Sequence, residues 1–429
     1  SHSIKKNNLF VGIKGKKKDG NNFLNQAVKN GANYCITTKS AKENFKFIRV
    51  KNTMNFLNNL AKSKRNLSSA KFIAITGSSG KTTVKTIIGN LLKKYSETYF
   101  SPKSYNNQFG VPLSISNINP NHNFGVFELG MNKFNEINKL SRLVRPHIGL
   151  ITNISEAHLE NFKNIEGIAK AKSEIIYNIK KGGTIILNRD DKFFNYFKKI
   201  ENKKNIKITS FGYSEKSDIR FISLIKKNRF FLLKIQINGK KNLIRINNAN
   251  NNNIMNILSS IAVINELNLD LHKIKNFFKN QNLLEGRGKI NKITKSNKKF
   301  YLIDESYNAN PLSVKSAIQN FSNIQKNGKK KYFLFGDMLE LGRNSLIYHK
   351  KISKLINNSD IDKTFVYGKK SLETYKFLKK NKKGEVVRDL KSFTNEILKF
   401  IKNGDFLMIK GSNATKLYEL SNRFLGGAK

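Results

Sequence analysis

The chain has 429 residues, which is enough for two to four domains with substantial hydrophobic cores. Its formal net charge of +51 is spread along the whole chain together with many Asn, Ile and Phe residues, so we interpret it as compositional bias and expect no specific nucleic-acid partner. A single cysteine, Cys35, excludes a disulfide framework within the chain and a cysteine-rich zinc site, and no run is long and apolar enough for a membrane span.

The amino terminus lacks the apolar core of a signal peptide, so we expect a cytoplasmic protein. The first residue is Ser1 and not Met, and we expect that the natural start of the chain is missing. We expect a monomer.

Strand-like and helix-like segments alternate along the chain, which predicts α/β layers with mostly parallel sheets. The predicted strands are 72–75, 125–129, 148–153, 184–188, 301–304, 332–335, 364–367 and 406–410, and the clearest helices are 84–92 and 254–267. Linker-like composition at 62–70 and at 285–289 divides the chain into three predicted domains, 1–69, 70–283 and 284–429.

A glycine-framed turn follows the strand predicted at 72–75 and precedes the helix predicted at 84–92. Its two glycines allow successive N–H groups to face phosphate oxygens at a helix N-terminus. The pattern predicts a nucleoside-triphosphate site, in which Lys81 reaches the terminal phosphates and Thr82 ligates magnesium. Ile75 stands where the common pattern has its first glycine, so an ordinary strand-to-helix turn remains the alternative. The predicted nucleotide-binding residues here are Gly77, Ser78, Ser79, Gly80, Lys81, Thr82 and Thr83.

Further motifs follow in one order along the chain, and the ordered set resembles the Mur ligases, the ATP-dependent amide-forming enzymes of peptidoglycan precursor synthesis. They are Leu9-Phe-Val-Gly, Asn106-Asn107, Glu128-Leu-Gly, Thr152-Asn153, Ala157-His158-Leu159, Ala169-Lys-Ala-Lys172-Ser-Glu174, Gly286-Arg287, Asp304-Glu-Ser-Tyr-Asn-Ala-Asn-Pro311, Gly336-Asp-Met-Leu-Glu-Leu-Gly342 and Lys410-Gly-Ser412. The resemblance implies a three-domain architecture: a small α/β N-terminal domain, a central P-loop ATPase domain with a parallel sheet, and a Rossmann-like C-terminal domain.

The resemblance also implies a chemistry, in which the ATP γ-phosphate activates a substrate carboxylate before an amine attacks it. Lys81 and Mg²⁺ neutralise charge in this scheme, with Thr82 and Glu128 as metal ligands and His158 as ligand of a second Mg²⁺. The lysine that relatives carbamylate to hold the second metal matches Lys172 best, and Lys170 is the runner-up. Taken without the resemblance, Glu128 is a strand-end charge and Lys172 belongs to a solvated helix face.

Other residues are implied to hold the ligands. Asn253 and Asn256 face the adenine, while Arg287 and Asp304 or Glu305 reach from the third domain toward the phosphates and ribose. The implied substrate-binding residues are Ser1 and Ser3 at the uridine end, Asn106 and Asn107 at the muramoyl group, and Tyr307, Asn308, Asn310 and Asp337 in the third domain. A turn-and-cap role is the alternative for the segment 306–311.

The two third-domain motifs favour the branch of the family that joins D-alanyl-D-alanine to UDP-N-acetylmuramoyl-tripeptide. The diaminopimelate-adding branch carries an Asp-Asn-Pro-Arg box that this sequence lacks. Two positions depart from the family pattern. Asn252 stands where the family usually has His, and Glu305 stands where it often has Asp. The alternatives are another ligase such as a folate polyglutamating enzyme, a catalytically idle binding protein, and a basic P-loop ATPase acting on nucleic acid. Because the ATP groups come from two domains, we expect the third domain to swing about 285–289.

Overall fold

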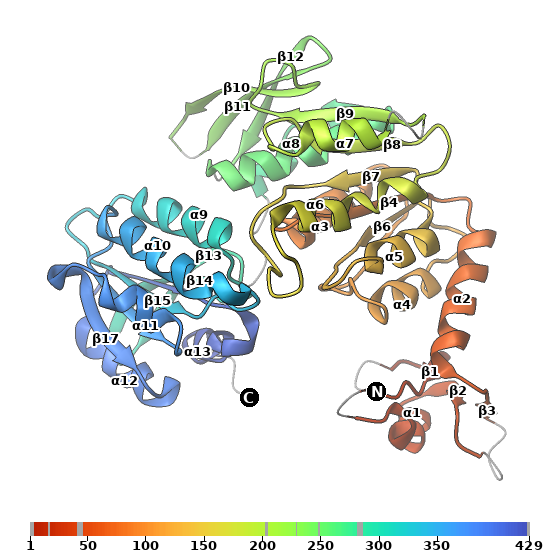
Figure 1. Cartoon of the computed structure of the whole chain (residues 1–429), viewed down its shortest axis with the longest axis horizontal. Helices are drawn as coiled ribbons and strands as arrows, with labels where there is room; N and C mark the ends of the chain where they lie inside the picture. Colours follow the sequence, from red (N-terminus) through yellow and green to blue (C-terminus); the bar gives the residue numbers. More distant parts are fainter. Residues whose placement is uncertain are drawn as a thin grey trace.

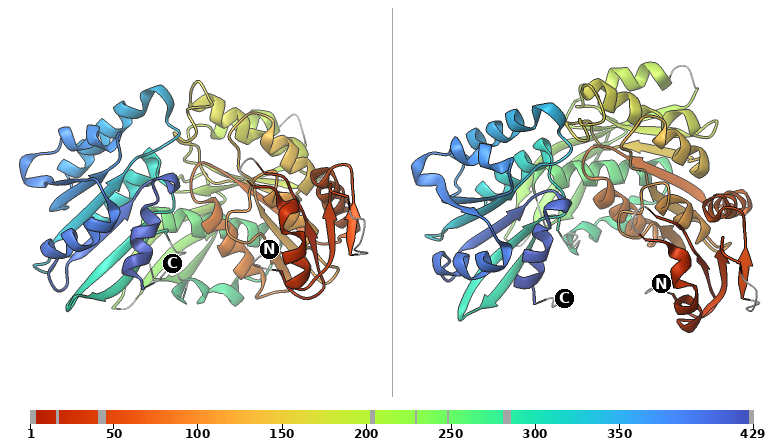
Figure 2. Two further views of the ribbon diagram at one scale, coloured as in Figure 1. Left: turned by 90° about the horizontal axis from the view of Figure 1, so that it is seen from below. Right: turned by 60° about the horizontal axis from the view of Figure 1, so that its bottom comes forward.

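The strands assemble into three separate sheets (Figure 1). The computed structural model describes residues 4–15, 18–40, 46–201, 205–228, 230–247, 249–280 and 286–426. Figures 1 and 2 show the N-terminal part in red and the C-terminal part in blue on the two sides of a larger central part. The predicted α/β class with mostly parallel sheets is confirmed.

The N-terminal part is a small parallel sheet with strand order β1-β2-β3. Its core forms where Leu24 and Ala27 of the short helix α1 pack against Ala32 and Cys35. A longer helix, α2, then leads away from the sheet and packs against helices of the central part (Figure 1). The bounds are β1 Asn8–Val11, α1 Leu24–Lys29, β2 Ala32–Thr37, β3 Phe47–Arg49 and α2 Thr53–Leu67.

The central part is a nine-stranded sheet with order β12-β11-β10-β9-β8-β7-β4-β6-β5. In this order the strands from β10 to β5 are parallel, and β11 runs antiparallel to both of its neighbours, β10 and β12. The strands are β4 Lys71–Thr76, β5 Thr98–Phe100, β6 Phe124–Glu128, β7 Ile148–Ile151, β8 Thr184–Asn188, β9 Lys207–Gly212, β10 Ile219–Lys226, β11 Phe231–Ile237 and β12 Lys240–Ile246. The helices are α3 Lys81–Leu92, α4 Gly110–Ser116, α5 Glu136–Val144, α6 Ile165–Ser173, α7 Phe194–Glu201 and α8 Asn251–Glu266.

Helices cover both faces of this sheet. The core on one face gathers side chains of α4, α5, α6 and α7, and the core on the other face gathers those of α3 and α8. Every residue of β4 after Lys71 is buried, as expected for a strand between two helical layers. Because β6 and β7 lie on opposite sides of β4, their carboxyl ends form the crevice where ligands of open α/β sheets bind.

The C-terminal part is a six-stranded sheet with order β13-β14-β18-β15-β16-β17, parallel except for β13. Helices α9, α10 and α11 lie on one face, and α12 and α13 on the other. The strands are β13 Lys289–Lys295, β14 Lys298–Glu305, β15 Lys331–Gly336, β16 Lys363–Tyr367, β17 Lys383–Val387 and β18 Phe406–Lys410. The helices are α9 Pro311–Ser322, α10 Ser345–Asn357, α11 Ser371–Lys376, α12 Leu390–Phe400 and α13 Leu417–Phe424.

Short 3-10 helices complete the fold at Gly20–Phe23, Ile176–Asn178, Leu271–Ile274, Phe277–Asn280, Gly342–Asn344, Lys380–Lys382 and Asn413–Thr415. Among the described residues, no helix has the length and apolar character needed to cross a membrane.

Candidate active site

The glycine-framed turn joins the end of β4 to the start of α3. Gly77 and Gly80 both have positive φ angles, 146° and 83°. A Cβ atom on Gly77 would lie 1.9 Å from Thr152 Oγ1, so a larger residue does not fit there. The turn therefore depends on glycine for its backbone angles and for its close approach to the end of β7.

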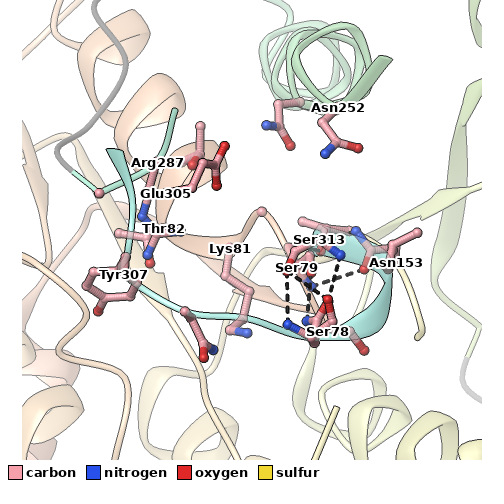
Figure 3. Close-up of a pocket in the computed structure, with 18 of the residues that line it drawn as sticks. Ser78, Ser79, Lys81, Thr82, Asn153, Asn252, Arg287, Glu305, Tyr307 and Ser313 are labelled. Atoms are coloured by element: carbon pink, nitrogen blue, oxygen red, sulfur yellow. Dashed lines mark hydrogen bonds between the residues drawn. The ribbon is translucent and has the colours of Figure 1, made fainter. Parts of the chain in front are cut away.

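The residues after β7 hold this turn in place. Thr152 Oγ1 donates to the carbonyl oxygen of Ser79 at 2.6 Å, and Ser79 N donates to Asn153 Oδ1 at 3.1 Å. Ser78 N donates to the carbonyl oxygen of Asn153 at 2.9 Å (Figure 3). Thr152 and Asn153 appeared in the sequence only as parts of a motif, and their contacts with the turn give them a role in shaping it.

Lys81 is the first residue of α3, and Figure 3 shows it between the Ser78 and Ser79 side of the cavity and the Tyr307 side. Its Nζ donates to the carbonyl oxygen of Gly77 at 2.7 Å. Burial lowers the pKa of Lys81, and the negative charges of Glu128 and Glu340 oppose this effect. Among the described residues no carboxylate forms an ion pair with Lys81, so its ammonium is well suited to exchange the carbonyl for a phosphate oxygen.

Oxygen and amide groups surround the carboxylate of Glu128 at the end of β6. Thr82 Oγ1 donates to Glu128 Oε2 at 2.7 Å, and Asn106 Nδ2 donates to Glu128 Oε1 at 2.8 Å. Ser104 Oγ lies 3.1 Å from Thr82 Oγ1. The Glu128 side chain is buried, so the structure brings the predicted residues Thr82, Glu128 and Asn106 into one cluster and adds Ser104.

His158 and Lys172 line the same cavity from the central part. His158 Nδ1 lies 2.6 Å from Glu340 Oε2, which belongs to the loop after β15. This contact lowers the pKa of Glu340. Lys172 is buried in α6, and burial lowers its pKa well below the usual range, with the charge of Lys81 adding to the effect.

The C-terminal part supplies the facing wall of the cavity, whose volume is about 1560 Å³. Asn310 Nδ2 donates to Ser79 Oγ at 3.1 Å, and the Tyr307 hydroxyl donates to Ser104 Oγ. The Arg287 guanidinium carbon lies 4.2 Å from the centre of the Tyr307 ring. Figure 3 shows Arg287, Glu305 and Tyr307 together at one side of the cavity.

The other predicted residues that line the cavity are Ser78, Gly80, Thr83, Asn107, Asn253, Asn256 and Asn308. Asn256 lies close enough to Gly80 that a Cβ atom on this glycine would come within 2.9 Å of Asn256 Oδ1. The side chain of Asn107 also accepts from Gly110 N at 3.0 Å, at the start of α4. Ser1 and Ser3 lie outside the described residues.

Two predicted ligand-binding carboxylates, Asp304 and Asp337, do not line the cavity. Asp304 Oδ1 accepts hydrogen bonds from Ser306 Oγ at 2.6 Å and from Ser421 Oγ at 3.0 Å. Asp337 Oδ1 accepts from Ser371 N at 2.7 Å, at the start of α11. Of the pair Asp304 and Glu305, only Glu305 faces the cavity, with Oε2 3.2 Å from Lys410 Nζ.

Comparison with known proteins identifies the class to which this fold and site belong. The Mur ligase middle domain matches residues 75–264, and the Mur ligase, glutamate ligase domain matches residues 290–413. A protein of Buchnera aphidicola subsp. Baizongia pistaciae is 34% identical over 415 residues, which cover 95% of this chain and 87% of that protein. The chain therefore belongs to the Mur ligase family.

That Buchnera protein is named UDP-N-acetylmuramoyl-tripeptide--D-alanyl-D-alanine ligase. A protein of Rickettsia prowazekii has the same name and is 32% identical over 97% of this chain and 92% of its own length. The crystal structure of MurF from Acinetobacter baumannii superposes with a TM-score of 0.85 at 26% identity and covers 99% of this chain and 92% of that chain. The predicted family and three-domain architecture are confirmed.

Proposed function

We propose that the chain joins D-alanyl-D-alanine to UDP-N-acetylmuramoyl-tripeptide in an ATP-dependent reaction of peptidoglycan precursor synthesis. One observation carries the proposal: residues 78–80 of the turn, the Glu128 cluster, and Tyr307, Asn308 and Asn310 line a single cavity between the central and C-terminal parts. This arrangement can gather a nucleotide, a carboxylate and an amine, and such positioning supplies much of the rate of a reaction with several substrates. The names of the relatives support the choice of these two substrates.

The reaction proceeds in two steps. The tripeptide carboxylate attacks the ATP γ-phosphorus, and ADP departs to leave an acyl phosphate. The free amine of D-alanyl-D-alanine then attacks the acyl carbon, and the tetrahedral intermediate collapses to the amide and phosphate. Lys81 and the N–H groups at the start of α3 bind the phosphates, where they stabilise the negative charge that develops during transfer.

The residues around Glu128 fit Mg²⁺, because Thr82 and Ser104 hydroxyls and a carboxylate are hard oxygen donors. Within the described residues, no group of three or more His, Cys, Asp or Glu side chains could hold a metal ion. Mg²⁺ is commonly bound by one or two carboxylates together with substrate phosphates, so Thr82 and Glu128 are sufficient protein ligands. Bound there, the ion would neutralise charge on the phosphates, and His158 would be a ligand of a second ion.

Carbamylated Lys172 would add a second carboxylate at this place. Carbamylation needs a neutral amine, and burial, which lowers the pKa of Lys172, favours that form. We also propose the division of labour among the predicted domains. Residues 1–69 bind the uridine end, 70–283 bind ATP, and 284–429 bind the dipeptide and close over ATP.

Phosphate release from ATP tests this function. We expect release only when both UDP-N-acetylmuramoyl-tripeptide and D-alanyl-D-alanine are present, together with formation of the amide product. Lys81→Ala should lower the rate by on the order of 100-fold because it removes a phosphate-binding charge. Lys94→Ala is the matched control, since Lys94 is exposed just beyond the end of α3. Release stimulated by DNA alone, or full activity of Lys81→Ala, would refute the proposal.

A further inference from the structure

A second lysine of α3, Lys85, lies one turn after Lys81 and is 1% exposed. It does not line the cavity. Among the ion pairs of the described residues none involves Lys85, so this buried ammonium has no carboxylate in direct contact. A buried charge is unfavourable unless hydrogen bonds compensate it, which makes its partners informative.

The partners of Lys85 are two main-chain carbonyl groups. Its Nζ donates to the carbonyl oxygen of Ser101 at 2.5 Å and to that of Lys103. Lys103 has a φ of 46°, a left-handed conformation that is uncommon for residues other than glycine. The Lys85 ammonium thus binds both sides of a strained turn between β5 and α4, where charge-assisted hydrogen bonds are stronger than those of neutral donors.

This turn begins the segment 101–107, which carries two side chains of the active site. Ser104 Oγ contacts Thr82 Oγ1 and accepts a hydrogen bond from the Tyr307 hydroxyl of the C-terminal part. Asn106 donates to Glu128 Oε1, and its carbonyl oxygen accepts from Gly130 N at 2.7 Å. The placement of both side chains therefore depends on where the turn at 101–103 lies.

We propose that Lys85 is a positioning residue, whose ammonium anchors the segment 101–107 so that Ser104 and Asn106 face the substrate cavity. The inference rests on the proposed function for its effect on catalysis. Burial lowers the pKa of Lys85 to about 8, and the charge of Glu128 opposes this effect. The phosphate-binding turn is held by Thr152 and Asn153, so the backbone that binds the ATP phosphates does not depend on the segment 101–107. We therefore expect the loss of Lys85 to affect binding of the muramoyl substrate more than binding of ATP.

The C-terminal part offers a matched control. Lys331 is also fully buried, and its Nζ donates to the carbonyl oxygen of Ser322 at 2.8 Å and to Asp360 Oδ2 at 3.0 Å. It does not line the cavity. Unlike Lys85, this ammonium also has a carboxylate partner. Lys331→Met thus removes a buried ammonium and an ion pair without disturbing the segment 101–107.

The test compares Lys85→Met with Lys331→Met and the unchanged chain. In Lys85→Met we expect the KM for UDP-N-acetylmuramoyl-tripeptide to rise about tenfold and the KM for ATP to change by less than about twofold. Hydrogen–deuterium exchange should accelerate in the peptide that covers 101–107 without any ligand present. In Lys331→Met neither the two KM values nor the exchange rate of this peptide should change. Should Lys85→Met fail to fold, Lys85→Gln, which removes the charge and shortens the side chain but keeps an amide NH₂ group, serves in the same two measurements.

The exchange measurement does not need catalysis, so it separates this inference from the proposed function. Unchanged exchange at 101–107 in a folded variant would overturn the inference. An equal rise of both KM values, or the same KM change in Lys331→Met, would also overturn it, because a general loss of stability would then be the cause. If the unchanged chain made no amide, the proposed function would be refuted. The exchange result would still test whether Lys85 anchors the segment 101–107.

Discussion

Three lysines of this lysine-rich chain lie in or next to the active-site cavity and have a pKa that burial lowers. Lys81 lines the cavity, Lys172 lies buried at its wall, and Lys85 supports it from behind. The positive charge of Lys81 adds to burial at Lys172 and lowers its pKa well below the usual range, so Lys172 is the amine expected to be neutral.

Whether Lys172 is carbamylated can be measured directly. In ¹³C-bicarbonate, the unchanged chain should show a carbamate carbon signal by NMR, because a neutral amine adds carbon dioxide. Lys172→Met should lose the signal and lower amide synthesis by on the order of 100-fold, the larger effect typical of groups that support a metal. Lys170→Met is the control, since Lys170 is exposed on the same helix. A signal that disappeared only in Lys170→Met would assign the carbamate to Lys170.

A second titratable residue affects stability and not catalysis. His147 Nδ1 accepts a hydrogen bond from Phe72 N at 2.9 Å, which requires an unprotonated nitrogen. Burial and the charges of Lys180, Arg65 and Lys71 lower the pKa of His147 from 6.5 to about 4. Because the unfolded chain binds the proton more readily, this contribution to stability is complete above pH 6.5 and is lost as the pH falls toward 4.

We therefore expect the free energy of unfolding to fall between pH 6.5 and pH 4 more steeply in the unchanged chain than in His147→Asn. Asparagine keeps an acceptor for Phe72 N–H but does not titrate. Urea denaturation at a series of pH values measures the difference. Equal slopes for the two proteins would show that His147 does not contribute.

Among the elements, the turn between β4 and α3 has the least tolerance for change. Gly77 combines a positive φ with the close approach to Thr152 Oγ1, and that hydroxyl in turn bonds the carbonyl oxygen of Ser79. Gly77→Ala should displace the turn, and a displacement of about 1 Å at a reactive site lowers activity by on the order of 100-fold. Steady-state kinetics with ATP as the varied substrate measures this effect.

Gly182 provides the control for Gly77→Ala. It has a φ of 73°, but apart from its two chain neighbours no described residue has a heavy atom within 4 Å of an added Cβ. Gly182→Ala should therefore lower stability by about 1 kcal/mol through backbone strain, without changing the kinetics. Similar kinetic losses in both variants would indicate that strain, and not the clash with Thr152, is responsible.

The start of α9 shows how one residue serves two purposes. Asn310 caps the helix by accepting from Ser313 N at 2.8 Å, and Pro311 occupies the first turn. The same side chain donates to Ser79 Oγ of the phosphate-binding turn. The turn-and-cap interpretation of this motif and the ligand-binding interpretation are therefore compatible, because capping uses the amide oxygen and leaves the amide nitrogen for the cavity.

At the scale of the whole molecule, several contacts close the C-terminal part against the central part. They join Glu340 to His158, Tyr307 to Ser104, and Asn310 to Ser79. Gly286 and Gly288, which have φ angles of 70° and 88°, lie in the predicted hinge 285–289, of which residue 285 is outside the described residues. Both glycines adopt backbone angles that are uncommon for other residues, and glycine can change these angles more freely than other residues, as a hinge requires.

We expect small-angle X-ray scattering to show a smaller radius of gyration with a non-hydrolysable ATP analogue and UDP-N-acetylmuramoyl-tripeptide than without ligands. Glu340→Gln should weaken the contact with His158 and reduce this contraction. Glu385→Gln, at an exposed position of β17, should contract like the unchanged chain. A scattering profile that ligands do not alter would contradict closure about 285–289.

The sequence predicted the elements whose signals are local. The strands at 184–188 and 406–410 have the predicted bounds, and the helix predicted from residue 84 begins at Lys81. The strands β10, β11 and β12 were not predicted. β11 and β12 do alternate buried residues with more exposed ones, as a half-buried strand should, but many of the exposed positions are Lys, Arg or Asn, which are also typical of loops. The strand predicted to reach residue 153 ends at Ile151, where Thr152 and Asn153 turn toward the phosphate-binding loop.

The sequence alone determined the family and the phosphate-binding turn, since these depend on residue types at short spacing and on the order of motifs. Only the tertiary structure decided which polar groups meet across the cavity. Tyr307 contacts Ser104, which lies 203 positions earlier in the sequence, and Glu340 pairs with His158. Asp304 accepts a hydrogen bond from Ser421 and does not face the cavity. Such contacts form when separate sheets pack together, and spacing along the chain carries no direct information about that packing.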